Sequence, residues 1–167
     1  MKGQGEILVF VLLFIISIIL FVSATMWSKG IFQQNIDVAR IESSEKFMRD
    51  LNENIQSVIK FGGSKEMRYD LDGTIGLVGS DTIEVKIPIT IPLPSNWINI
   101  SSDSYHYIQE KLEGDTLRLQ LVFLPSDYQV QLFTDGSVLA NPSYIKVERN
   151  QTINVGVTII KIKITFA

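Results

Sequence analysis

The feature that most constrains this chain is an uninterrupted apolar run near its amino terminus, from Ile7 to Ala24. The run contains no charged residue, and Ser17 and Ser23 are its only polar side chains. At about 1.5 Å of rise per residue, ~18 helical residues reach roughly 27 Å, close to the hydrocarbon thickness of a bilayer. A backbone in lipid has to satisfy its own hydrogen bonds, so the run should be helical. The sequence therefore predicts a transmembrane or filament-core helix over residues 7–26.

A cleaved secretory signal is the competing interpretation of this run. Val22-Ser23-Ala24 has the small-residue spacing that signal peptidases accept, and Lys2 supplies a basic start. The run is nevertheless longer than the ~7–15 residues usual in such signals, and Glu6 precedes it. Trp27 and Lys29 follow it as interfacial anchors of a retained helix do. We favour a retained single-pass helix in the cell membrane, with the C-terminal domain outside.

Composition limits the rest of the chain to one modest domain without cysteine chemistry. The chain has 167 residues, a net charge of -3 and a pI near 5.2, which argues against a nucleic-acid partner. It contains no cysteine, so neither a disulfide framework nor a thiolate metal site can form.

A second helical pattern follows the anchor, over residues 27–63. Its apolar residues recur at three- and four-residue steps, which makes a stripe along one helix face. Gly62-Gly63 predicts the helix end. No proline lies between Glu6 and Phe61, so anchor and stripe can form one helix, with Gly30 its weakest point. We expect the stripe to pack on the chain's own downstream domain rather than on a partner helix. The stripe consists of Phe47, Met48, Leu51, Ile55, Val58 and Ile59.

From Met67 onward the pattern changes from helical to alternating. Between Thr82 and Leu93, isoleucine, valine and leucine alternate with polar residues and with Pro88 and Pro92. This alternation predicts a half-buried strand. Proline has no N–H for a sheet ladder, so we expect this strand, at least in its second half, to lie at a sheet edge.

Turn residues predict how other strands connect. Pro125-Ser126-Asp127 separates apolar runs at 117–123 and 128–132, which favours a hairpin. Asp72-Gly73 predicts a second hairpin, between short strands at 67–71 and 74–78.

The remaining C-terminal segments are also β-like. Asp135-Gly136 marks a turn, and Ile145 with Val147 marks a strand. The apolar parity changes between residues 153–159 and 160–166, which requires a bulge near Ile159-Ile160 or a turn near Asn154-Gly156. Residues 105–112 fit either a short helix or a strand. We predict an α+β protein: a long N-terminal hydrophobic and amphipathic α-helix, then an antiparallel β-sandwich-like head domain over residues 67–167.

A search for catalytic or metal-binding residues finds little. His106 is the only histidine, and its neighbours in sequence rarely form a triad, so we expect a surface or loop histidine. Residues 70–73 resemble part of a calcium loop but lack its other ligands, and a hairpin turn explains them better. Five aromatic residues fit core packing better than a sugar- or protein-binding surface. They are Trp97, Tyr105, Tyr107, Tyr128 and Tyr144. We predict no enzymatic activity, no cofactor and no metal.

Two motifs and one charge suggest surface exposure and subunit pairing. Asn99-Ile100-Ser101 and Asn150-Gln151-Thr152 are N-glycosylation sequons, which suit an outward-facing domain. Glu6 stands at the entrance of the apolar helix, where burial would cost a few kcal/mol unless it is paired or interfacial. It either lies in the headgroup layer or pairs between subunits.

Lys2-Gly3-Gln4, then Glu6, then an apolar helix and a β-rich head resemble an archaeal type IV pilin. In particular, residues 1–6 resemble the class III-like leader that a prepilin peptidase cuts between glycine and glutamine. The resemblance implies that Gly3 ends the leader, that Gln4 begins the mature chain and that Glu6 offsets a neighbouring subunit's terminal amine. The family's acidic residue usually lies fifth in the mature chain, whereas Glu6 would be third.

The resemblance implies a cell-surface structural subunit that assembles through its N-terminal helix into a filament for adhesion or motility. Its partners would then be the membrane, further copies of the chain and pilus- or archaellum-type assembly components. The alternative is a non-polymerising, membrane-anchored accessory protein whose β head binds a cell-envelope protein or glycan. A membrane-anchored enzyme is a third reading, with no site to support it.

Overall fold

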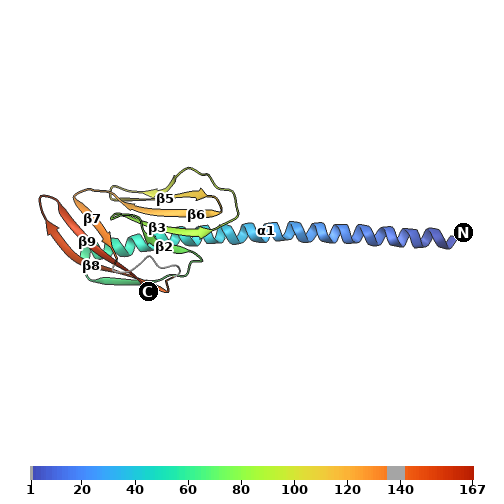
Figure 1. The fold of residues 1–167 in the computed structure, drawn as a ribbon, viewed down its shortest axis with the longest axis horizontal. Helices are drawn as coiled ribbons and strands as arrows, with labels where there is room; N and C mark the ends of the chain where they lie inside the picture. Colours follow the sequence, from blue (N-terminus) through green and yellow to red (C-terminus); the bar gives the residue numbers. More distant parts are fainter. Residues whose placement is uncertain (1, 135–141) are drawn as a thin grey trace. The chain divides into compact units, whose positions relative to one another are not determined.

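The computed structural model describes residues 2–134 and 142–167, with side chains from residue 7 onward. One helix, α1 (Lys2–Phe61), precedes two sheets of mainly antiparallel strands, so the predicted α+β fold is confirmed (Figure 1). The chain divides into two compact units, residues 1–37 and 38–167. We describe each unit separately.

The first unit consists of the N-terminal part of α1. Its backbone is helical through Gly30, so the position predicted to be weakest does not interrupt the helix. Absence of proline is the physical reason, because a single glycine costs only about 1 kcal/mol in a helix interior. One helix therefore carries both the apolar run and the amphipathic pattern that follows it.

The second unit begins with the C-terminal part of α1, where the predicted apolar stripe is buried. All six stripe residues are at most 7% exposed, so packing on the chain's own downstream domain is confirmed. The helix ends at Phe61, as the glycine pair predicted. The Gly62 N–H donates to the Val58 carbonyl (2.9 Å), and its φ of 73° is a backbone conformation that glycine adopts without strain.

The larger sheet has five strands in the order β2-β3-β6-β5-β4, all antiparallel. On β6 every second residue faces inward and is apolar, namely Leu117, Leu119, Leu121 and Phe123. The strands are β2 (Thr74–Leu77), β3 (Thr82–Pro88), β4 (Ile98–Ser102), β5 (His106–Glu113) and β6 (Thr116–Phe123).

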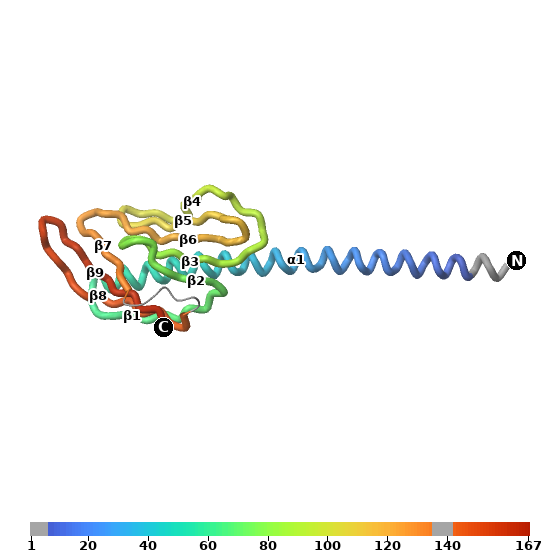
Figure 2. The backbone as a smooth tube through the Cα atoms, viewed as in Figure 1, coloured from blue at the N-terminus to red at the C-terminus, as the bar shows by residue number. Residues whose placement is uncertain are grey.

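The smaller sheet has four strands in the order β1-β8-β9-β7 (Figure 2). Its β7–β9 pair is parallel and the other pairs are antiparallel. A bulge between Arg149 and Gln151 interrupts the ladder of β8 with β9. The strands are β1 (Ser64–Arg68), β7 (Tyr128–Phe133), β8 (Tyr144–Asn154) and β9 (Thr158–Phe166).

Both sheets and α1 share one hydrophobic core. Hydrogen bonds also tie the helix to each sheet: Asn52 Nδ2 lies 2.8 Å from His106 Nε2 on β5, and Arg149 Nη1 on β8 donates to the Ile59 carbonyl (3.2 Å). The C-terminal part of α1 is therefore an integral part of the head and supplies apolar side chains to the shared core.

Both predicted hairpins are wrong. The turn at residues 125–127 leads from β6 in one sheet to β7 in the other, and β7 pairs with β9. The turn at Asp72-Gly73 likewise leads from the sheet of β1 to that of β2. Gly73 is needed for a close approach instead: a Cβ there would lie 2.3 Å from the Lys86 carbonyl oxygen. Each strand has one apolar face, and that property alone does not select its partner.

The edge position predicted for the strand after Thr82 is also wrong. β3 lies between β2 and β6, and its outward-facing Glu84 is buried as well. The strand ends at Pro88, so the proline terminates the ladder rather than marking an edge. The residues up to Leu93 are not part of a strand.

Two further ambiguities are resolved. Residues 106–113 form strand β5 and not a helix. The change of parity near the C-terminus is achieved by a turn, because β8 ends at Asn154 and β9 starts at Thr158. The turn predicted at Asp135-Gly136 lies outside the described residues.

Candidate functional site

The apolar segment of α1, Ile7–Met26, is exposed along its whole length. From Ile7 to Val22, the large apolar side chains are between 43% (Ile16) and 74% (Phe10) exposed. By length and composition this helix is able to span a bilayer. An apolar surface of this size is costly in water, so lipid or further protein has to cover it.

Two of the three hydroxyl side chains of this segment bond to its own backbone. Ser17 Oγ donates to the Leu13 carbonyl, and Thr25 Oγ1 donates to the Val22 carbonyl, each at 2.8 Å. Such bonds satisfy a hydroxyl without water. The segment therefore suits a dry environment on all its sides.

Gly3, Gln4 and Glu6 lie in the helical backbone of α1, and their side chains are outside the description. Leader processing at Gly3-Gln4 and subunit pairing through Glu6 stay predictions.

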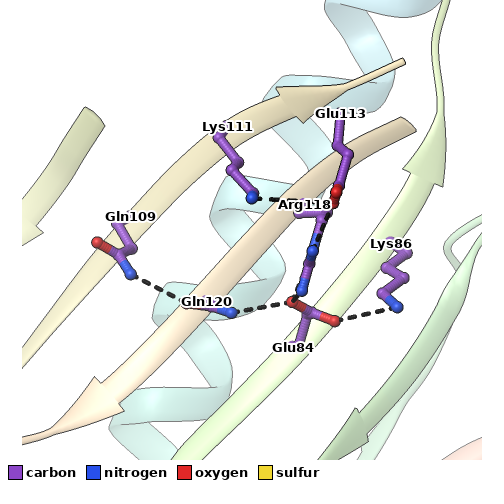
Figure 3. Close-up of polar contacts among 7 residues, drawn as sticks. All are labelled: Glu84, Lys86, Gln109, Lys111, Glu113, Arg118 and Gln120. Carbon is purple, nitrogen blue, oxygen red and sulfur yellow. Dashed lines mark hydrogen bonds and ion pairs between the residues drawn. The ribbon is translucent and has the colours of Figure 1, made fainter. Parts of the chain in front are cut away.

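A polar network covers part of the outer face of the five-stranded sheet (Figure 3). At its centre the Glu84 side chain is 5% exposed and is bound by three neighbours. Arg118 Nε donates to it at 2.8 Å and Gln120 Nε2 at 2.9 Å, while Lys86 Nζ lies 3.3 Å away. Arg118 also pairs with Glu113. A buried carboxylate with this many donors is a stabilising feature of the sheet, with little capacity left for a ligand.

These contacts set the pKa values of two carboxyl groups. Burial alone would raise the pKa of Glu84, but the hydrogen bonds from Arg118, Gln120 and Lys86 outweigh burial and hold it below its usual value. The hydrogen bond from Arg118 likewise lowers the pKa of Glu113. Both carboxylates are therefore charged at neutral pH.

Glu110 lies on the opposite, inward face of β5 and behaves differently. Burial, and secondarily the negative charge of Glu45 on α1, raise the pKa of Glu110 above its usual value. Its Oε2 atom is buried without a hydrogen-bond partner among the described residues. Folding therefore favours the protonated form of this side chain.

The prediction that the five aromatic residues pack in the core is wrong for three of them, whereas Tyr128 packs against the core. Trp97, Tyr105 and Tyr144 are exposed, and the other two are half-buried. Trp97 lies beneath the Lys111 ammonium, 4.8 Å from the ring centroid. Tyr105 and Tyr128 stack with ring centroids 5.9 Å apart. Isoleucine, leucine and valine supply most of the core, together with four other aromatic residues, Phe47, Tyr69, Phe123 and Phe166.

The prediction of a surface or loop histidine is wrong too. His106 is 8% exposed, at the start of β5. Its Nδ1 lies 2.9 Å from Asp103 Oδ1, and its Nε2 faces Asn52. Asp103 also accepts the backbone N–H groups of Tyr105 and His106. His106 thus fastens the start of β5 to α1, a role that sequence neighbours alone do not indicate.

The carboxylates of the calcium-like fragment face arginines. Asp70 pairs with Arg68 at 2.8 Å, and Asp72 pairs with Arg40 at 3.2 Å. Among residues 2–134 and 142–167, no group of three or more carboxylate, histidine or cysteine side chains is arranged to hold a metal ion. The sequon asparagines Asn99 and Asn150 are both exposed.

Comparisons with protein-family models, with curated proteins and with solved structures give no match for this chain. Its fold and surface define a class: an α+β protein with a β-rich head and one apolar N-terminal helix able to anchor it in a membrane.

Proposed function

We propose that this chain is a pilin-like structural subunit of the cell surface. It is held in the membrane by α1 before assembly and joins a filament through the same helix. The observation that carries the proposal is the apolar segment Ile7–Met26, which is exposed on all sides over far more than a single helix face. The leader-like Lys2-Gly3-Gln4 and the acidic Glu6 support it.

The apolar segment is suited to both environments that this function requires. In lipid, helices associate through close packing rather than through the hydrophobic effect. In a filament core, further copies of the segment would replace the lipid on each side. A carboxylate at Glu6 would then lie close to the terminal amine of a neighbouring subunit, where pairing offsets the cost of removing both charges from water.

The test combines N-terminal mass spectrometry with filament yield in the natural host. We expect the mature chain to begin at Gln4 and to be recovered in sheared surface filaments. Glu6→Ala should lower filament yield at least tenfold and leave the amount of membrane-bound chain unchanged. Glu42→Ala, which removes an exposed carboxylate from the head part of α1, is the matched control and should assemble normally.

An intact Met1 together with a chain found only as membrane-bound monomer would overturn filament assembly. That result would favour the anchored accessory protein, in which the exposed segment contacts lipid alone. Normal filament yield from Glu6→Ala would remove the pairing role while leaving assembly in place.

A further inference from the structure

The outer face of the four-stranded sheet contains a pocket, lined by both polar and apolar residues, that the assembly proposal does not use. Its volume is about 320 Å³, at the small end of the range for ligand sites. It is lined chiefly by Ser80, Gln131, Phe133, Asn150, Gln151 and Lys161.

Strand register explains why amides surround a lysine in this pocket. Lys161 on β9 lies opposite Gln131 on β7 and opposite Gln151 on β8, so three polar side chains form one row across the sheet. The bulge between Arg149 and Gln151 makes this possible. It adds one residue to β8, so that Arg149 bonds to α1 while Gln151 shares the outer face.

The edge of the pocket is closed by the loop between β2 and β3. The Leu132 N–H on β7 donates to the Ser80 carbonyl at 2.7 Å, which fixes this loop beside the edge strand. Three strands and one loop from the other sheet therefore build the pocket walls. None of these positions depends on the first unit of the chain.

The charge in the pocket is uncompensated. Among the part of the chain that the structure describes, Lys161 has no carboxylate partner, whereas Lys86, Lys111 and Lys146 each pair with a glutamate. Lys161 is also half-buried, so water screens its charge less than that of a fully exposed lysine. A single unpaired ammonium between two carboxamides favours a ligand with one negative charge and several hydroxyl groups.

We propose that this pocket binds a carboxylate-bearing sugar, a hexuronate residue of a glycan. The ammonium of Lys161 would bind the sugar carboxylate, and the two glutamine amides would exchange hydrogen bonds with ring hydroxyls. The ring of Phe133 offers an apolar surface for the C–H face of the sugar. One lysine matches the single charge of a carboxylate better than the double charge of a phosphate.

The experiment is a titration of the full chain in detergent micelles, produced without N-glycosylation so that Asn150 stays unmodified. Glucuronate is the probe, and glucuronamide is its neutral counterpart of nearly equal shape. Backbone NMR shifts measure binding. We expect saturable binding of glucuronate with shifts at residues 131, 151 and 161, and at least tenfold weaker binding of glucuronamide. Acetate and sulfate should also bind at least tenfold more weakly.

Three variants separate charge from folding. Lys161→Met should weaken glucuronate binding at least tenfold, while Lys161→Arg, which keeps the charge, should stay within about threefold of the original. Lys65→Met, at a β1 lysine that does not line the pocket, should bind as the original does.

Several results would overturn the proposal. They are an absence of saturable binding, equal binding of glucuronamide, an unaffected Lys161→Met, or an equal loss in Lys161→Arg or Lys65→Met. Acetate or sulfate binding as tightly as glucuronate would show an adventitious ion only and would remove the sugar. Each of these outcomes is independent of whether the chain forms filaments.

Discussion

The two parts of α1 are built from similar residues and serve opposite purposes. In the segment Ile7–Met26 apolar side chains cover every side of the helix, and all the large ones are exposed. Between Phe47 and Ile59 they occupy one side and are buried, while charged residues such as Arg49 and Glu53 face water. The same helix is thus an open apolar surface in one part and a core element in the other.

The difference lies in the period of the apolar residues rather than in their number. A stripe repeating every three or four residues matches the helical repeat and can face one core. A run with only two serines among its apolar residues has no continuous polar side, so lipid or other helices suit its surroundings. Four pairs of substitutions test the roles of these parts and of the sheet packed on them, in order of decreasing effect.

Truncation of a leucine should affect the two parts very differently. Leu51→Ala removes a fully buried side chain and should lower the free energy of unfolding of the head by about 2–5 kcal/mol. Leu20→Ala, at a side chain that is 64% exposed, should leave it unchanged. Thermal unfolding of the full chain in detergent, followed by near-ultraviolet circular dichroism, measures both. Equal losses would contradict the contrast.

A charge in the apolar segment should impair membrane insertion without unfolding the head. Ile16→Arg places a guanidinium near the centre of the run, at a cost of about 2.5–3.5 kcal/mol for insertion. The membrane-bound fraction after alkaline extraction should fall sharply. Gln34→Arg, beyond the run, is the control and should remain membrane-bound. Retention of both variants would mean that the segment is not the anchor.

The buried part of α1 also contains a polar contact that should matter for stability. Asn52→Ala leaves His106 Nε2 buried without its partner and should cost about 1–3 kcal/mol of unfolding free energy. Asn54→Ala removes only a weak contact with the Met67 sulfur at 3.7 Å and should cost less than about 0.5 kcal/mol. Denaturant titration of both variants gives the comparison. If Asn54→Ala lowered the unfolding free energy as much as Asn52→Ala, the contact of Asn52 with His106 would not be the cause of the loss.

The smallest expected effect depends on pH and concerns Glu110, which faces α1. Because folding raises the pKa of Glu110, its stabilising contribution is complete below the unfolded value near 4.5 and is lost as pH rises through the folded value. Glutamine cannot ionise, so Glu110→Gln avoids the loss of stability that accompanies ionisation of the buried carboxyl group. The variant should therefore unfold at a higher temperature than the original at pH 7, and the difference should vanish near pH 4.

Glu113→Gln, on the same strand, should change the stability at pH 7 in the opposite direction. The pKa of Glu113 is lowered in the folded state, so its contribution is present above the unfolded value and disappears as pH falls. At pH 7 this variant should be slightly less stable than the original. A Glu110→Gln variant destabilised at pH 7 would contradict the burial argument.

Local patterns predicted the elements of the head better than their connections. The alternation over residues 128–132 correctly indicates β7, but its partner is β9, some thirty residues further along the chain. Choice among partners depends on how three apolar surfaces, two sheets and a helix, close over one core. A turn such as Pro125-Ser126-Asp127 is compatible with a hairpin and with a crossing between sheets.

Some candidate surfaces can likewise be recognised in the sequence, whereas others are formed only by the fold. The apolar segment and the sequons are visible in the sequence because their residues are contiguous. The Lys161 pocket and the Glu84 network are not visible there, because each gathers residues from three or more separate strands and loops. A bulge of one residue in β8 decides whether Gln151 faces outward.

The sequence by itself determined a long helix with an apolar N-terminal segment and a β-rich C-terminal domain. The spacing of apolar residues and the residues that form turns determine these elements, because both act over only a few neighbouring residues. Only the tertiary structure decided which strands pair, that β3 lies inside its sheet, that His106 is buried and that Trp97, Tyr105 and Tyr144 are exposed. Those outcomes depend on which distant surfaces exclude water together. The free energy gained by removing these apolar surfaces from water depends on the whole core and cannot be assigned to a single segment.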